Sequence, residues 1–294
     1  MEESRMKQRL LPWIVNNIER HLSWYSLCVN PNAITLLEMN QDKIDWDRLS
    51  INKNALHLLE VNLDRISLDW LDSPNLIYLI DASKSKKKWS HLSSNPNAIY
   101  LLEANPNKID WKRLSVNPNA IHLLEANQDK IDWRNLSYNP NAIHLLEANQ
   151  DKINWSLLCE NPNAIHLLEA NRNKIDWMYL SSNPNAIHLL EANQDKIDWM
   201  YLSSNPNAIH LLETNLDKID WYKLSKNPNA MQLLEANQKK IDWSQISTNP
   251  SIFQWDYTFY RERMDVHREA LTKAMFHPKR LKRSLELGYD LFDV

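Results

Sequence analysis

The chain has 294 residues, a formal net charge of −3, 43% hydrophobic residues and a single glycine. This apolar content is enough to form a folded core, which excludes intrinsic disorder. The lone glycine excludes glycine-rich phosphate loops and dinucleotide turns and argues against hairpin-rich β folds, and the near-neutral charge gives no general attraction to nucleic acid or anionic lipid.

The sequence also bears on the compartment. No uninterrupted apolar run approaches the roughly 18 residues that a membrane span requires, and the first residues lack the basic-then-apolar order of a signal peptide. Two cysteines are too few for a disulfide-based scaffold. We therefore expect an intracellular protein without a transmembrane segment.

A repeat of 22 residues dominates the chain. The string Asn-Pro-Asn-Ala begins at Asn95, Asn117, Asn139, Asn161, Asn183, Asn205 and Asn227, and the same register reaches Asn30, Asn52 and Asn249. We number each repeat from this asparagine as position 0. In these terms Ile occupies position 4, Leu-Leu positions 6 and 7, Glu position 8, Asn position 10, Trp position 16 and Leu position 19, with few exceptions.

Both ends of the array are incomplete. The residues before Asn30 keep the register, with Ile14 at position 6 and Trp24 at position 16, but lack the Asn-Pro-Asn start. At the other end, Asn249 opens a repeat that is never completed. The predicted organisation is an N-terminal capping partial repeat over 1–29, a repeat solenoid over 30–248 and a C-terminal helical cap over 249–294.

Positions 0 to 10 predict a helix of about ten residues with a broad apolar face. Asn at position 0 is a favourable N-cap, and Pro at position 1 fits the first helical turn. We expect Asn at position 10 to adopt the left-handed conformation that glycine usually takes at a helix end.

Positions 15 to 19 predict a second, shorter element. Asp at position 15 can cap a turn that contains Trp and Leu at the helical spacing of three. This element could be an α-helix, a 3₁₀ helix or a strand. The helical alternative predicts an elongated all-α solenoid of about eleven repeats.

A leucine-rich repeat is the rival fold, because its period is similar and Ile-x-Trp-x-x-Leu-x-x-Asn loosely resembles its motif. The match is out of phase by one apolar position, however, and β-branched residues are scarce around the tryptophan. The all-α solenoid is therefore favoured.

The tail beyond Trp255 leaves the repeat pattern. Its apolar spacing predicts an amphipathic helix over about 256–275, a break at Pro278 and a last helix that ends near Gly288. We expect this helical pair to cover the apolar face of the last repeat.

The repeat resembles that of a protein family from giant DNA viruses, whose motif is close to Asn-Pro-Asn-Ala-Ile-x-Leu-Leu-Glu-x-Asn-x-x-Lys-Ile-x-Trp-x-x-Leu-Ser. Residues 161–181 match this motif throughout, and the segment from Met275 to Arg280 resembles the family's closing segment. The repeat around Ser73 departs from it, since Lys87 replaces the isoleucine of position 14. The resemblance implies a viral protein, in the host cytoplasm or the virion, and transfers no catalytic residues.

Several recurring polar side chains resemble sites but have simpler explanations. Histidine recurs at position 5, and stacked helices would hold successive copies about 8–10 Å apart, too far to share a metal ion. The Glu, Lys and Asp ladders at positions 8, 13 and 15 are typical of caps and inter-repeat ion pairs. Cys28 and Cys159 replace the usual Ser of position 20 and lie too many repeats apart to form a disulfide. We expect no catalytic residues, metal or cofactor.

The positions that vary inside the fixed frame are the better functional signal. Positions 17, 18 and 21 carry a set of side chains that favours a protein partner if it faces outward. The candidate partner-binding residues are Arg134, Tyr138, Met178, Tyr179, Met200, Tyr201 and Tyr222. Partial packing inside the solenoid is the alternative.

The sequence therefore predicts a non-enzymatic scaffold or protein-interaction protein. The alternative is a nucleic-acid-binding protein that uses the basic clusters Lys84–Lys88 and Lys279–Arg283. An overall basic groove, which a repeat protein that reads RNA would need, is missing, so neither nucleic acid nor a membrane is the expected partner.

Overall fold

The computed structural model describes residues 8–15, 21–62, 65, 86–255, 268, 270 and 272–274. The chain divides into two compact units, residues 10–253 and residues 1–9 with 254–294. Nearly all of the second unit lies outside the described residues. Of its predicted helical pair, only residues 268, 270 and 272–274 are described, and they are helical.

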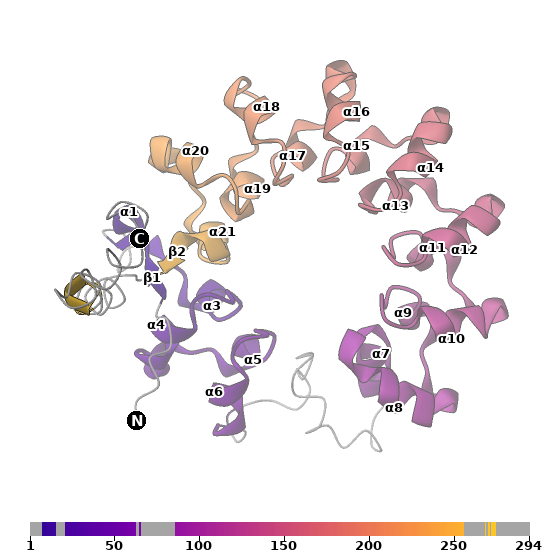
Figure 1. The fold of residues 1–294 in the computed structure, drawn as a ribbon, viewed down its shortest axis with the longest axis horizontal. Helices are drawn as coiled ribbons and strands as arrows, with labels where there is room; N and C mark the ends of the chain where they lie inside the picture. Colours follow the sequence, from indigo (N-terminus) through magenta and orange to yellow (C-terminus); the bar gives the residue numbers. More distant parts are fainter. Residues whose placement is uncertain are drawn as a thin grey trace, which may run out of the picture. The chain divides into compact units, whose positions relative to one another are not determined.

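The unit 10–253 is an α-solenoid, as the sequence predicts. Each fully described complete repeat contributes two helices, and the helices form two rows in Figure 1. The first-helix row contains α4 (Ile34–Glu38), α6 (Leu56–Glu60), α8 (Ile99–Ala104), α10 (Ile121–Glu125), α12 (Ile143–Ala148), α14 (Ile165–Ala170), α16 (Ile187–Glu191), α18 (Ile209–Glu213) and α20 (Met231–Ala236). The second-helix row contains α3 (Trp24–Leu27), α5 (Trp46–Leu49), α7 (Lys86–Ser94), α9 (Trp111–Leu114), α11 (Trp133–Leu136), α13 (Trp155–Glu160), α15 (Trp177–Leu180), α17 (Trp199–Leu202), α19 (Trp221–Lys226) and α21 (Trp243–Ile246).

Short elements complete the unit. The 3₁₀ helices are η1 (Gln41–Lys43), η5 (Pro96–Ala98), η6 (Pro106–Lys108), η7 (Gln128–Lys130), η8 (Gln150–Lys152), η9 (Arg172–Lys174), η10 (Gln194–Lys196), η11 (Gln238–Lys240) and η12 (Pro250–Ile252). Near the chain ends lie α1 (Pro12–Val15) and two short strands, β1 (Gln8–Leu10) and β2 (Phe253–Trp255), which pair with each other.

The first helix is shorter than predicted because it begins at position 4 rather than position 1. In the repeat of α12, the Asn139 Oδ1 atom accepts a hydrogen bond from the backbone N–H of Asn141 at 3.0 Å. This local side-chain bond holds positions 0 to 3 in a turn and competes with helix formation. The asparagine therefore caps a turn, and α12 starts only at Ile143.

The expected left-handed conformation at position 10 is wrong. Asn149 has φ −138° and ψ 53°, on the negative side of φ. Its Nδ2 group donates to the carbonyl oxygen of Leu145 at 3.0 Å, which satisfies a carbonyl in the last turn of α12. The side chain thus ends the helix without the backbone conformation that glycine favours.

The second helix follows the prediction closely and is α-helical. The carboxylate of Asp132 at position 15 accepts from the backbone N–H of Asn135 at 2.9 Å and caps α11. Leu136 at position 19 is fully buried, and so is Ala142 at position 3 of the next repeat. The core is therefore a continuous line of small and aliphatic side chains along the array.

Consecutive repeats are joined by the buried asparagine of position 0. The Nδ2 group of Asn161 donates to the carbonyl oxygen of Asn139, which opens the preceding repeat, at 2.9 Å and to that of Ser137, at the end of the repeat before it, at 3.2 Å. Asn161 has no exposed surface. Because a buried amide must find partners, this residue fixes the spacing of successive repeats.

A second inter-repeat contact places a lysine or arginine over the position-16 tryptophan in most of the described repeats. Lys174 Nζ lies 4.4 Å from the ring centroid of Trp155 in the preceding repeat. The equivalent distances elsewhere in the described array are 4.5 to 4.9 Å. Trp46 and Trp89 are buried, whereas tryptophans such as Trp155 are half-buried and pack against the core. Position 16 therefore contacts both the core and a lysine or arginine.

The two ends of the array are hydrogen-bonded to each other, so the expectation of an elongated array is wrong. The Nδ2 group of Asn30 donates to Ser247 O at 3.0 Å and Asn249 O at 2.9 Å. The equivalent pair of bonds is made by the position-0 residues Asn52, Asn117, Asn139, Asn161, Asn183, Asn205, Asn227 and Asn249. Asn32 Nδ2 likewise donates to Pro250 O at 2.9 Å. We call this set of bonds the closure contact, and Figure 1 shows α3 beside α21 there.

The closure contact assembles one repeat from both ends of the chain. Asn249 and the residues that follow it supply positions 0 to 4, and later positions come from residues 12–15 and 21–29. The backbone N–H of Leu11 donates to Ile252 O at 2.8 Å, and that of Ser23 donates to Ser247 Oγ at 3.0 Å. The ring of His21, at position 13, stacks on Trp243 at a centroid distance of 5.1 Å, where other repeats place a lysine or arginine. The two incomplete repeats of the sequence thus complete each other.

Candidate interaction surface

The residues at positions 17, 18 and 21 lie on or beside the second-helix row, and we call them the variable face. Tyr138, Met178, Met200 and Tyr222 are exposed, with exposed fractions of 48%, 36%, 43% and 48%. Arg134 is also exposed. These five candidate residues are therefore accessible to a partner.

The remaining two candidates are less accessible. Tyr179 packs against the core, and Tyr201 is half-buried. Their rings contact each other edge to face, with centroids 5.8 Å apart. This contact joins two adjacent repeats. Each of the two tyrosines directly follows an exposed methionine in the sequence, Met178 or Met200.

Further residues belong to the same face although the sequence analysis did not single them out. Tyr25 at position 17 is 54% exposed, and the Arg48 guanidinium lies 4.4 Å from its ring centroid. Lys226 Nζ lies 5.4 Å from the centroid of Tyr222, and Lys223 Nζ lies 5.8 Å from that of Tyr201. The sequence could have indicated these residues, because they occupy the same repeat positions, 17, 18 and 21, as the candidate residues.

The variable face is basic, although the whole chain carries a net charge of −3. In the described repeats, its basic residues are Arg48, Lys112, Arg113, Arg134, Lys223 and Lys226, and its acidic residues are Asp47 and Glu160. Burial raises the pKa of the Glu160 carboxyl above its ordinary value. Positive charge therefore predominates on this face.

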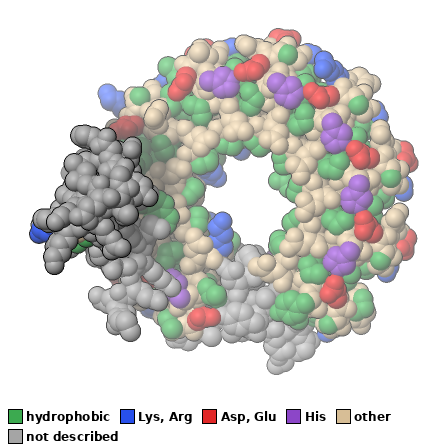
Figure 2. All heavy atoms as spheres, in the orientation of Figure 1, with side chains coloured by type: hydrophobic (Ala, Val, Ile, Leu, Met, Phe, Trp, Pro, Cys, Tyr) green, Lys and Arg blue, Asp and Glu red, His purple; other side chains and the backbone are tan. Residues whose placement is uncertain are grey.

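The histidine ladder consists of histidine–glutamate pairs between consecutive repeats. Each histidine lies beside the Glu at position 8 of the preceding repeat, as in the 2.8 Å separation of His166 Nε2 and Glu147 Oε1. Figure 2 shows histidine and acidic side chains alternating along the array. The other pairs are His57–Glu38, His122–Glu103, His144–Glu125, His188–Glu169 and His210–Glu191. Because both side chains are about half exposed, each pair adds little stability.

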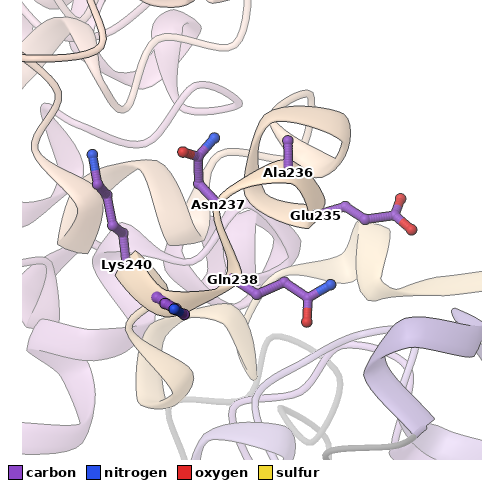
Figure 3. Close-up of a pocket in the computed structure, with 6 residues that line it drawn as sticks. Glu235, Ala236, Asn237, Gln238 and Lys240 are labelled. Carbon is purple, nitrogen blue, oxygen red and sulfur yellow. The ribbon is translucent and has the colours of Figure 1, made fainter.

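A shallow pocket of about 450 Å³ lies where α20 meets η11. It is lined by Glu235, Ala236, Asn237, Gln238, Lys239 and Lys240. Figure 3 shows the side chains of Glu235 and Gln238 extending away from Lys240, which stacks over Trp221. The lining groups do not converge on a common point, so this pocket has no arrangement suited to a ligand.

Both cysteines are free and buried. Burial raises the pKa of both thiols, and that of Cys159 rises to about 11. The Cys159 Sγ atom accepts from the backbone N–H of Asp176 at 3.3 Å, as a Ser Oγ atom does at position 20 of other repeats. The cysteines are therefore structural substitutes for serine.

The two basic clusters are largely untested. Lys84 and the cluster Lys279–Arg283 lie outside the described residues, and nothing is described of the side chains of residues 86–88 at the start of α7. Within the described part of the chain, no helix is long and apolar enough to cross a membrane.

Residues 50–258 match the family model described as periplasmic copper-binding protein (NosD). The match covers well over half of the 294 residues, so the chain belongs to that family. No curated protein and no solved structure matches the chain significantly.

The described residues do not fit the copper ion in the family's name. Protein copper sites combine imidazole with thiolate or thioether ligands around one ion. In the described ranges, no group of three or more His, Cys, Asp and Glu side chains lies together. The ladder histidines are paired with glutamates of neighbouring repeats, and the cysteines are buried separately.

Proposed function

We propose that this protein is a non-enzymatic interaction scaffold that binds a partner protein on its variable face. The observation that carries the proposal is the exposure of Met178, Met200 and Tyr222 at one repeat position inside an otherwise fixed frame. Tyrosine and methionine are favoured at protein interfaces because they bury large area and adapt to a partner's shape. In three successive repeats, position 17 thus holds an exposed side chain of this kind.

The rest of the described array supports a structural role for the frame. The fixed polar residues, such as Asn161, hold the repeats together by hydrogen bonds. Side chains that join repeats are occupied by those bonds, whereas Met178, Met200 and Tyr222 at position 17 are exposed. Repeat scaffolds usually combine fixed residues that hold the repeats together with variable residues on a binding surface.

The test is capture of proteins from a host-cell lysate by the full chain and by the variant Met178→Ala/Met200→Ala. We expect the variant to lose its captured proteins at least severalfold while its melting temperature changes little, because both side chains are exposed. Met39→Ala is the control, since Met39 is 79% exposed but lies at position 9, off the variable face. Equal capture by the wild type and the Met178/Met200 variant would contradict the proposal.

We further propose that the protein works inside an infected cell or a virion, since the repeat motif resembles that of giant-virus proteins. The printed name of the matched family points to the periplasm instead. Immunofluorescence of infected cells and proteomics of purified virions test this proposal. Detection only in a bacterial periplasmic fraction would contradict it.

A further inference from the structure

We infer that the partner of the variable face is an acidic protein segment that also carries apolar side chains. This inference rests on the proposed function and specifies the partner's chemistry. The first support is charge, because six basic residues and two acidic residues occupy the face in the described repeats. Complementary charge steers association and selects among partners.

The order of side chains along the stack is the second support. Basic Lys112, Arg113 and Arg134 come first, followed two repeats later by Met178 and Met200. The next repeat carries Tyr222 and Lys226. An apolar stretch thus has basic residues on both sides, which matches a segment whose apolar side chains are flanked by carboxylates.

The closure contact extends this face. It places the repeat that contains Tyr25 directly after the repeat of α21, through the hydrogen bond from Ser23 N to Ser247 Oγ. Tyr25 and the adjacent Arg48 therefore continue the row of aromatic and basic side chains beyond Tyr222 and Lys226. Ser244 occupies position 17 of the repeat that lies between those of Tyr222 and Tyr25. A segment that binds along the variable face would therefore contact repeats at both ends of the array.

The cations on the aromatic rings favour a polypeptide over a nucleic acid. Single-stranded nucleic acids bind such surfaces by stacking bases on aromatic rings. Here Arg48 covers Tyr25, and Lys226 lies over Tyr222. Carboxylates can bind these cations from outside without displacing them from the rings, whereas a base would have to replace them.

The test uses fluorescence anisotropy with the full chain and three labelled probes. The first probe is a 20-residue peptide of alternating Glu and Leu or Tyr, the second replaces every Glu by Gln, and the third is a 20-nucleotide oligo-dT. We expect the acidic peptide to bind about tenfold more tightly than its Gln counterpart, and its affinity to fall with added salt. Oligo-dT is expected to bind no better than the Gln peptide.

Two charge variants locate the site. Lys226→Glu should weaken the acidic peptide severalfold, because it removes a cation on the face and adds a repelling charge. Lys239→Asp changes the net charge by the same amount at position 12, where Asp129 and Asp151 stand in other repeats. This control variant should bind the peptide as the wild type does.

The remaining outcomes overturn the inference in distinguishable ways. Equal binding of the Gln and acidic peptides, both weakened by Met178→Ala/Met200→Ala, would overturn the acidic partner and leave the interaction surface in place. Preferred binding of oligo-dT, sensitive to Lys226→Glu, would overturn both the acidic partner and the proposed function. Equal loss in the Lys226→Glu and Lys239→Asp variants, or binding of no probe, would overturn the inference about this face.

Discussion

At the scale of single residues, the array depends on the asparagine that opens each repeat. Its side-chain amide makes two kinds of hydrogen bond, as Asn161 shows. The Oδ1 atom accepts from a backbone N–H of the local turn, and the Nδ2 group donates to two carbonyl oxygens of earlier repeats. No other side chain of similar size has a carbonyl acceptor together with two N–H donors, and even a protonated aspartic acid has only one O–H donor. This explains a feature of the sequence, the near absence of other residues at position 0.

Replacing this asparagine should be costly. Asn161→Ala leaves two buried carbonyl oxygens without their donor, and we expect it to lower the free energy of unfolding by about 2–3 kcal/mol. Asn163→Ala is the matched control, because its bond to Pro140 O is exposed and should contribute about 1 kcal/mol or less. Urea denaturation measures both. Equal effects of the two substitutions would show that burial of the position-0 amide is not decisive.

A substitution at the cysteine of position 20 is expected to keep or raise the stability rather than lower it. Cys159→Ser should leave stability unchanged or raise it by about 0.5–1 kcal/mol, since a hydroxyl accepts and donates better than a thiol. At the equivalent site, Ser181 Oγ accepts from Asp198 N at 3.0 Å and donates to Trp177 O at 2.7 Å. The reverse change Ser181→Cys should destabilise. Thermal unfolding checks both variants, and a marked loss of stability in Cys159→Ser would contradict the assignment.

At the scale of the elements, the sequence predicted the presence of the elements better than their ends. The 22-residue period and the apolar positions were sufficient to predict two elements per repeat and to favour an all-α fold, and Asp132 indicated where the second element begins. Whether that second element is an α-helix, a 3₁₀ helix or a strand was left open by the sequence. The start of the first helix was misplaced because a local turn at Asn139 competes with the helix. The end was misread because Asn149 uses its side chain rather than a left-handed backbone. In both cases a side-chain hydrogen bond outweighed the backbone preference inferred from composition.

The tryptophan of position 16 joins the two rows and the neighbouring repeat. Trp155→Ala should lower the free energy of unfolding by about 3 kcal/mol, the lower end of the range for large aromatic truncations, because the ring is only half-buried. Lys174→Ala removes only the cation over that ring and should cost about 0.5–1 kcal/mol. Guanidinium denaturation of both variants tests the order of the two effects. A larger loss from Lys174→Ala would contradict the core contact of Trp155.

At the scale of the molecule, the main finding is that the repeat array joins its own ends within the unit 10–253. The closure contact reproduces the pair of bonds that joins the other described repeats, such as that of Asn161, with Asn30 donating to Ser247 and Asn249. The sequence contained the two halves of the composite repeat, but periodicity does not reveal whether halves at opposite ends of a chain meet. That depends on the small rotation between successive repeats, which accumulates along the array and is set by packing.

The most direct measurement of the closure is the distance between spin labels on exposed residues at position 17. Cysteines would replace Ser244 and Tyr25 in one variant and Tyr222 and Ser244 in another, in a background with Cys28→Ser and Cys159→Ser. The second pair spans two covalently consecutive repeats, and the first spans the closure contact. A closed array predicts matching, narrow distance distributions for the two pairs. A short distance for 222–244 beside a long, broad distribution for 244–25 would contradict the closure and the continuity of the variable face across it.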